Sequence, residues 1–291
     1  MLQPNIATNI DFTVGAELEF YLLTPEGETI ANLSTGKFPQ KRYSVSADYA
    51  ENLNLFLTQV VGYSVTPESG PGQYEVQFEP TADIEKLAAD INKFKEEASV
   101  AAGRAELYLS FEAKPLESHP GSSLHIHFSS QLFDPWGLVA NEGVVKMKRD
   151  GDNDFVLWAI GGMLQKMPED INIFVPTTES RLRIEPWLNA PTKICWGRNN
   201  RSTAIRIPDG KPKRIEHRVS GADADAKKVL KAVTDAAIYG IENKIQPDEP
   251  VFGNAWEDKY ERPLLLREAP QAPEGPEPEQ PTDTGAEPMQ P

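Results

Sequence analysis

Cysteine is almost absent from this sequence, in which Cys195 is the single one among 291 residues. No intrachain disulfide can form, so the composition gives no support to a secreted, disulfide-bonded protein. The sequence also lacks an apolar run approaching the ~20 residues that a membrane-spanning helix requires. Its first residues, MLQPNIATNIDF, contain neither the basic nor the apolar segment of a signal peptide. We therefore expect a soluble protein located in the cytoplasm.

Basic residues are scarce too, with 29 Lys and Arg against 44 Asp and Glu, for a formal net charge of -15. A surface this acidic disfavours nonspecific binding to nucleic acid or to an anionic membrane. It does not disfavour a small phosphorylated ligand, because individual arginines and metal ions hold phosphate groups locally. The partners that we expect are therefore small molecules, with no nucleic acid and no membrane.

The segment 263–291 differs in composition from the rest of the chain. It is rich in Pro, Glu and Gln, and from Pro270 onward it contains no aromatic residue, no Lys and no Arg. Such a segment cannot bury enough apolar surface to offset the entropy cost of ordering it. We expect one domain over residues 1–262 and a disordered acidic tail over 263–291. No internal repeat is visible.

Four segments have the amphipathic periodicity of helices that pack one face against a core. In the last of them, Asp223 is placed to cap the N-terminus. We expect these helices to be structural. They span about residues 48–61, 83–105, 153–167 and 223–245.

Four other segments alternate apolar and polar residues, as strands with one face in a core do. In DFTVGAELEFYLL, Leu18 and Phe20 belong to the apolar face, and Glu17 and Glu19 project together from the other. The polar faces of all four segments carry residue types that bind metals or anions. These are Glu17 and Glu19, then Glu75 in GQYEVQFE, then His125, His127 and Ser129 in GSSLHIHFSS, and finally Arg214, Glu216 and Arg218 in RIEHRVS.

An antiparallel sheet that gathers these faces would concentrate carboxylates, imidazoles and guanidinium groups in one cleft. Carboxylates packed so closely repel one another unless cations neutralise them. Oxygen ligands with one or two imidazoles suit Mg²⁺ or Mn²⁺ better than zinc, and arginines beside them suit phosphate or carboxylate groups. The pattern is equally consistent with a two-metal site that handles phosphoryl groups and with a charged structural face. The expected fold is α+β, with a curved antiparallel sheet bearing the site and helices packed on its other face.

The order and spacing of five segments resemble the catalytic domain of the glutamine synthetase family, from about Gly15 to Pro247. The segments are GAELEFYLL, ESGPGQYEVQFEP, GSSLHIHFS, RIEPWLNAPTKICWGRNNRSTAIRIP and RIEHRVSGADADAKKVLKAVTDAAIYGIENKI. The pair Trp196–Gly197 before the Asn-Arg motif is similar to the branch around the γ-glutamylpolyamine synthetases.

The resemblance implies ATP and two sites for Mg²⁺ or Mn²⁺. One metal would be held by Glu19, Glu68 and Glu75, and the second by Glu17, His125 and Glu216. The implied residues around the substrates are Arg183, Arg201 and Arg218 for the carboxylate and the transferred phosphate, Gly121 for the amino acid, and His127, Ser129 and Arg206 for the nucleotide.

The implied activity is an ATP-dependent ligase that joins the γ-carboxylate of glutamate to an amine. The carboxylate would attack the γ-phosphate of ATP to form an acyl phosphate, and the amine would then displace phosphate. Metals and arginines would stabilise the charge that develops during phosphoryl transfer. In the family this chemistry serves glutamine biosynthesis and nitrogen metabolism.

Several features depart from the family pattern. The sequence starts almost at the first catalytic strand, so we expect the small N-terminal β-grasp domain of relatives to be missing. Pro120 stands where relatives have an asparagine before Gly121, and Asn189 stands where many glutamine synthetases have the glutamate that deprotonates ammonium. Because Asn189 replaces this glutamate, the amine substrate is expected to be other than ammonia. The alternative is a catalytically impaired nucleotide- or metal-binding relic with a regulatory or assembly role. Formation of a homo-oligomer is left open.

Overall fold

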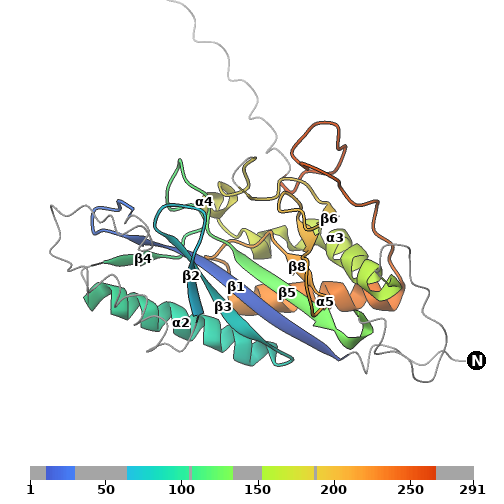
Figure 1. The fold of residues 1–291 in the computed structure, drawn as a ribbon, viewed down its shortest axis with the longest axis horizontal. Coiled ribbons are helices and arrows are strands. Elements are labelled where there is room, and N and C mark those ends of the chain that lie inside the picture. Colours follow the sequence, from blue (N-terminus) through green and yellow to red (C-terminus); the bar gives the residue numbers. More distant parts are fainter. Residues whose placement is uncertain (1–10, 30–63, 105–106, 134–152, 187–188, 267–291) are drawn as a thin grey trace, which may run out of the picture.

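The computed structural model describes residues 11–29, 64–104, 107–133, 153–186 and 189–266 (Figure 1). The helix expected over 48–61 lies outside these residues, as does the stretch 267–291 of the expected tail. Among the described residues, no helix is both long and apolar enough to span a bilayer.

A single eight-stranded sheet forms the centre of the described structure, in the order β2-β3-β1-β5-β8-β7-β6, with β4 paired to β1 outside this path. All pairs are antiparallel except β6 with β7, which is parallel. The predicted α+β fold is confirmed, although the sheet is mixed rather than wholly antiparallel. The strands are β1 Phe12–Leu23, β2 Ser64–Pro67, β3 Gln73–Thr81, β4 Tyr108–Ser110, β5 Leu124–Ser130, β6 Trp196–Arg198, β7 Ile205–Ile207 and β8 Ile215–His217.

Strand β1 lies between β3 and β5, and its alternation decides what each face of the sheet carries. Leu18 and Phe20 are fully buried on the apolar face. The cross-strand register places Glu19 opposite Glu75 and Glu17 opposite His125. Residues directly opposite in a sheet have Cβ atoms about 4.5–5.5 Å apart, so the polar side chains of neighbouring strands meet.

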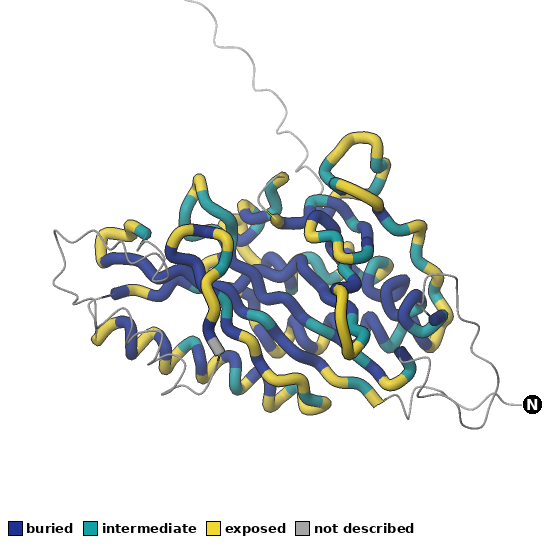
Figure 2. The backbone as a smooth tube through the Cα atoms, viewed as in Figure 1, coloured by how far each residue is buried: buried dark blue, intermediate teal, exposed yellow. Residues whose placement is uncertain are grey.

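Three long helices cover the apolar face of the sheet: α2 Ile84–Arg104, α3 Asp154–Phe174 and α5 Ala226–Asn243 (Figure 1). Helices α3 and α5 approach closely where glycines face each other. A Cβ on Gly162 would lie 2.1 Å from the carbonyl oxygen of Ala236, so only glycine fits there. Figure 2 shows the buried backbone running through the central strands and the inner sides of these helices, with exposed backbone at the outer loops.

The three predicted helices within the described residues are confirmed, with two corrections. Helix α3 does not end before Pro168 but continues to Phe174. It passes the proline at the cost of one main-chain hydrogen bond, because proline has no N–H. The N-cap of α5 is Asp225 rather than Asp223, since the carboxylate of Asp225 accepts a hydrogen bond from the main-chain N–H of Lys228 at 3.0 Å.

After α5 the chain continues through residues 246–266 with no helix or named strand, which we term the C-terminal strap (orange to red in Figure 1). Its end is attached to the domain. The main-chain N–H of Ile194 donates to the carbonyl of Pro263 at 2.7 Å, and that of Leu265 donates to the carbonyl of Thr192 at 2.9 Å. Leu265 is buried. The first residues of the segment 263–291 therefore pack onto the domain.

Candidate active site

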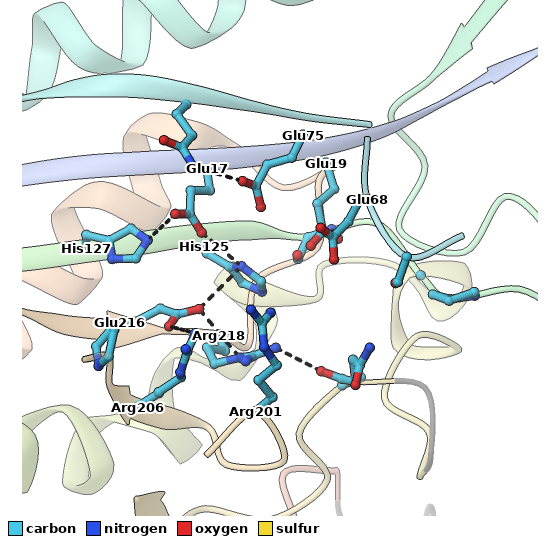
Figure 3. A pocket seen from close by; sticks show the side chains of 18 of the residues that line it. Glu17, Glu19, Glu68, Glu75, His125, His127, Arg201, Arg206, Glu216 and Arg218 are labelled. Atoms are coloured by element: carbon cyan, nitrogen blue, oxygen red, sulfur yellow. Dashed lines mark hydrogen bonds and ion pairs between the residues drawn. The ribbon is translucent and has the colours of Figure 1, made fainter. Parts of the chain in front are cut away.

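A cavity of about 270 Å³ opens on the polar face of the sheet, opposite the helices. It receives side chains from β1, β3, β5, β7 and β8 and from the loops between them (Figure 3). Every predicted site residue except Ser129 lines it. Those that do are Glu17, Glu19, Glu68, Glu75, Gly121, His125, His127, Arg183, Arg201, Arg206, Glu216 and Arg218. The hydroxyl of Ser129 instead donates to the carbonyl of Lys213 at 2.8 Å.

Glu17 lies at the centre of a group of carboxylates and imidazoles (Figure 3). Its Oε1 is 3.1 Å from Nε2 of His127, its Oε2 is 3.7 Å from Nδ1 of His125, and that nitrogen is 3.6 Å from Oε1 of Glu216. Burial alone would raise the pKa of Glu17, but hydrogen bonds and charge from the two histidines hold this pKa well below its ordinary value. The carboxylate of Glu17 is therefore ionised throughout the neutral range.

Within the described part of the chain, potential ligand atoms gather in two overlapping triads, each within 4.8 Å. They are Glu17, Glu75 and His125, and Glu17, His127 and Glu216. This grouping differs from the two ligand sets implied by the resemblance in two ways. Glu17 belongs to both triads, and His127 is a potential ligand in the second triad.

Glu19 is buried and held in place by one donor from β3 and one from Ser123, the residue before β5. Its Oε2 accepts a hydrogen bond from the main-chain N–H of Ser123 at 2.9 Å and lies 3.4 Å from the Nε2 donor of Gln73. Burial, and then the charges of Glu17 and of the other nearby glutamates, raises the pKa of Glu75 to about 8. Burial and the charge of Glu19 also raise the pKa of Glu68. Carboxylates that raise one another's pKa in this way are a fit site for divalent cations, which would neutralise the repulsion.

Two arginines flank Glu216 on the opposite wall of the cavity. Nη1 of Arg206 lies 2.9 Å from Oε2 of Glu216, and Nε of Arg218 lies 3.7 Å from Oε1. Burial would raise the pKa of Glu216, but the charges of Arg218 and of the neighbouring histidines and Arg206 lower this pKa. Nη2 of Arg218 donates to the carbonyl of Asn189 at 3.0 Å. Glu216 therefore joins the metal-ligand group to the arginine group.

Arg183 is 3% exposed and donates from Nη1 to the carbonyl of Val219 at 2.6 Å. Burial lowers the pKa of Arg183 to about 10, so its guanidinium still carries a charge at neutral pH. Among the described residues, Nε of Arg183 and both Nε and Nη1 of Arg218 are buried without a hydrogen-bond partner. Buried guanidinium donors without partners fit an anionic ligand such as phosphate or carboxylate.

Sequence reasoning missed Gln73, which lines the cavity and is 1% exposed. The alternation that placed Glu75 on the polar face of β3 also places Gln73 there, so the signal was present. His217 does not line the cavity and packs in the core instead. The ring lies fully buried 4.4 Å from the ring of Phe174, and burial lowers the pKa of His217 to about 3.

Known proteins resemble this chain in sequence and in fold. The family described as glutamine synthetase, catalytic domain, matches residues 2–274. Gamma-glutamylputrescine synthetase PuuA of Escherichia coli K12 is 30% identical over 263 residues, which cover 84% of this chain and 54% of that protein. Glutamine synthetase of Pyrococcus woesei is 31% identical over 259 residues, covering 86% and 56%.

A solved structure, a complex of GmaS with ADP, superposes with a TM-score of 0.70 at 22% identity over 89% of this chain and 62% of that one. This likeness concerns the fold. The chain spans about half the length of the curated relatives that it matches.

Proposed function

Since this chain belongs to the glutamine synthetase family through its catalytic domain, we propose that it is an ATP-dependent ligase that joins the γ-carboxylate of glutamate to an amine. Its relatives are ligases, and the family uses ATP and divalent metal ions. In the proposed reaction a γ-carboxylate oxygen attacks the γ-phosphorus of ATP, and the bond to ADP breaks. The amine nitrogen then attacks the acyl carbon of the resulting acyl phosphate, phosphate leaves, and the nitrogen loses a proton.

One observation carries this proposal: a single cavity has a cluster of carboxylates on one wall and buried arginines with unpartnered donors on the other. The divalent ions would neutralise phosphoryl oxygens and hold nucleophile and leaving group in line. The chain's own contribution is to hold the anionic substrates and to keep water out. The residues that we assign to the two metal sites are Glu17, Glu19, Glu68, Glu75, His125 and Glu216.

Arg183 and Arg218 are suited to stabilise charge on the acyl phosphate, because their free donors are already buried and oriented. Preorganised donors of this kind lower a barrier without the cost of reorganisation, and the loss of one typically costs about 2.7–4 kcal/mol. We assign Arg201 to the same anionic substrates. Gly121 would lie against the amino-acid substrate. A Cβ there would fall 2.5 Å from the carbonyl oxygen of Ala113, so no larger residue fits.

We assign the nucleotide to the side of the cavity that His127 and Arg206 line, with Ser129 on the same strand as His127. Nη2 of Arg206 donates to Oδ1 of Asn199 at 2.6 Å, so the guanidinium is held between this side chain and Glu216. Ser129 would act indirectly, through its hydrogen bond to the carbonyl of Lys213. We place the enzyme in the cytoplasm and propose that residues 1–262, together with the packed residues 263–265, form its catalytic domain.

The amine is proposed to be larger than ammonia. The two relatives named above have nearly equal identity to this chain but differ in the amine that their names imply, so overall similarity does not decide the amine. Asn189 favours an amine larger than ammonia, because it lines the cavity with a neutral side chain that cannot accept a proton from ammonium.

Phosphate release from ATP tests the proposal. The purified chain should release phosphate in the presence of Mg²⁺ or Mn²⁺, glutamate and an amine, and omission of either glutamate or the amine should abolish the release. Mass spectrometry should identify the γ-glutamyl amide. Binding of Mn²⁺ and ATP without turnover, for any amine in a panel of ammonia, alkylamines and diamines, would instead support the nucleotide-binding relic, which Pro120 and Asn189 favour.

A further inference from the structure

Asn189 and Ala190 form a short section of the cavity wall whose two main-chain carbonyls are held by two different side chains. Nη2 of Arg218, which also lines the cavity, donates to the carbonyl of Asn189 at 3.0 Å. The indole Nε1 of Trp256, which does not line the cavity, donates to the carbonyl of Ala190 at 2.9 Å. Asn189 also has a φ of 61°, a left-handed conformation that few residues other than glycine and asparagine adopt at low cost. The position of this wall section is therefore specified by contacts at both carbonyls.

Trp256 belongs to the C-terminal strap, and the strap is held by side chains of the segment that follows the wall. Nζ of Lys193 donates to the carbonyls of Glu257 and Tyr260, each at 2.9 Å. The main-chain N–H of Ala255 donates to Oγ of Ser202 at 2.9 Å. Anchors thus lie on both sides of Trp256 in the sequence. These anchors hold the indole of Trp256 in place, and the indole in turn holds the carbonyl of Ala190.

We propose that Trp256 is a positioning residue for the amine, because it fixes the wall at Asn189–Ala190 and so sets the space in which the amine fits. This inference rests on the proposed function, which assigns Asn189 to the amine. A wall section held by Arg218 alone can tilt about that one contact, whereas a wall section held at both carbonyls keeps its distance from the acyl carbon. Selectivity for amine size depends on this distance, because one methylene in a well-fitted pocket changes kcat/KM by about 10–200-fold.

The substitution Trp256→Phe removes the N–H donor and keeps an aromatic ring on a half-buried residue. Trp196→Phe is a matched control. The indole of Trp196 also donates to a strap carbonyl, that of Asp248 at 2.6 Å, but Trp196 does not line the cavity. Each variant therefore loses one indole hydrogen bond that involves the strap. The bond lost in Trp256→Phe holds the cavity wall, whereas the bond lost in Trp196→Phe does not.

The experiment measures kcat/KM for a series of amines of increasing length, with ATP and glutamate saturating, and the KM for ATP. We expect Trp256→Phe to reduce the ratio between the best and the poorest amine by about tenfold, with the KM for ATP unchanged. Trp196→Phe should leave that ratio unchanged. Hydrogen exchange of the amides over residues 189–195 should be faster in Trp256→Phe and not in Trp196→Phe.

Three results would count against the inference. An unchanged ratio in Trp256→Phe would overturn it, as would an equal change in Trp196→Phe or unchanged hydrogen exchange in Trp256→Phe. No turnover by the wild-type chain with any amine would overturn the proposed function, and the inference with it. Turnover in the wild type with an unaltered preference in the variant would overturn the inference alone.

Discussion

Oε2 of Glu19 accepts a hydrogen bond from the main-chain N–H of Ser123 at 2.9 Å. This contact joins β1 to the start of β5 and turns a predicted metal ligand toward the cavity. Gln73 supports the same carboxylate: its Nε2 lies 3.4 Å from Glu19 and donates to the carbonyl of Gly121 at 3.1 Å, and its Oε1 accepts from the N–H of Gly70 at 3.0 Å. One buried amide therefore orients both a metal ligand and a substrate loop.

Replacement of Gln73 by methionine should weaken metal binding without removing a ligand. Loss of a hydrogen-bond partner that orients a metal ligand typically costs about 10–100-fold in affinity. The groups left unpaired should also lower the free energy of unfolding by about 1–3 kcal/mol. Calorimetry with Mn²⁺ measures the first effect and urea denaturation the second. Gln165→Met, at an exposed position on α3, is the control; a variant at Gln73 with wild-type Mn²⁺ affinity would refute the assigned role.

Divalent ions should stabilise the chain, because a ligand that binds only the folded state raises its stability by mass action. Glu216→Gln should remove much of this response and also destabilise the metal-free chain. The carboxylate of Glu216 is 2% exposed and compensates both Arg206 and Arg218, and removal of one partner of a buried ion pair costs about 3–5 kcal/mol. Thermal unfolding with and without Mn²⁺ measures both effects.

The matched control for Glu216 is Glu169→Gln, which removes an exposed carboxylate paired with Lys166 on the surface of α3. Exposed pairs of this kind contribute at most about 1 kcal/mol. Equal increases in melting temperature with Mn²⁺ in the wild type and in Glu216→Gln would show that Glu216 holds no metal.

The stability of the metal-free chain should fall as pH rises toward the alkaline range. The pKa of Glu75 is about 8 in the folded chain, against an ordinary value of 4.5. Between these values the folded state binds more protons than the unfolded state, so the free energy of unfolding decreases with pH and levels off above about 8. With EDTA present, the melting temperature should be lower at about pH 9 than at about pH 6.

The variant Glu75→Gln should lose part of this pH dependence, since its side chain does not titrate. Mn²⁺ affinity should rise across the same pH interval in the wild type, because the metal binds the ionised carboxylate. A pH profile that is identical in the wild type and in Glu75→Gln would contradict the assignment.

Removal of the acidic tail should have different effects depending on where the chain is cut. A chain that ends at Ala269 should keep the melting temperature of the full chain, because the composition from Pro270 onward supplies no apolar anchor. A chain that ends at Arg262 should melt earlier, because it loses Leu265, whose burial contributes about 1.5–3 kcal/mol. Scanning calorimetry measures the melting temperatures of the two truncated chains. A marked fall in the melting temperature of the chain that ends at Ala269 would show that the tail packs on the domain.

The strands that carry the site could be predicted because their alternation is long and regular. β1 has twelve residues, and its period of two assigns Glu17 and Glu19 to one face without knowledge of the rest of the fold. β6 and β7 have three residues each, too few for a period to show, and both escaped prediction together with their parallel pairing. Local periodicity predicts which side chains share a face.

Contacts that depend on the register between strands could not be obtained in this way. His127 lies close to Glu17 because β1 pairs with β5. The two strands are about a hundred residues apart in the sequence, and nothing in the sequence specifies that they pair. The same applies to Trp256, whose indole reaches Ala190 across 66 positions of the chain. The capping residue of α5 shows a smaller failure of the same kind, because Asp223 and Asp225 are equally good caps by type and only the helix geometry selects Asp225.

Asn189 offers a direct test of how the amine is selected. A carboxylate at this position should restore a proton acceptor for ammonium, and general base catalysis typically contributes about 10²–10⁴-fold. The backbone determines which carboxylate to use. Asn189 has a φ of 61°, and this left-handed conformation costs most residues roughly 1–2 kcal/mol but is adopted more readily by Asn and Asp. Asn189→Asp should therefore increase kcat/KM for ammonium relative to larger amines, and Asn189→Glu should do so less, with a lower melting temperature.

The control for Asn189 acts on the other half of the reaction. Arg183→Ala should abolish phosphate release with every amine, because it removes the buried guanidinium that we assign to the acyl phosphate. Arg183→Lys keeps the charge but loses the forked donor geometry, so it should lower release with all amines by a common factor. Substitutions at the two positions should therefore give different patterns in one assay. Those at Asn189 should change the rates of different amines relative to one another, and those at Arg183 should change the rates of all amines together. A wild-type chain that already prefers ammonium would exclude the role given to Asn189, and an amine-dependent effect of Arg183→Lys would exclude the separation of the two steps.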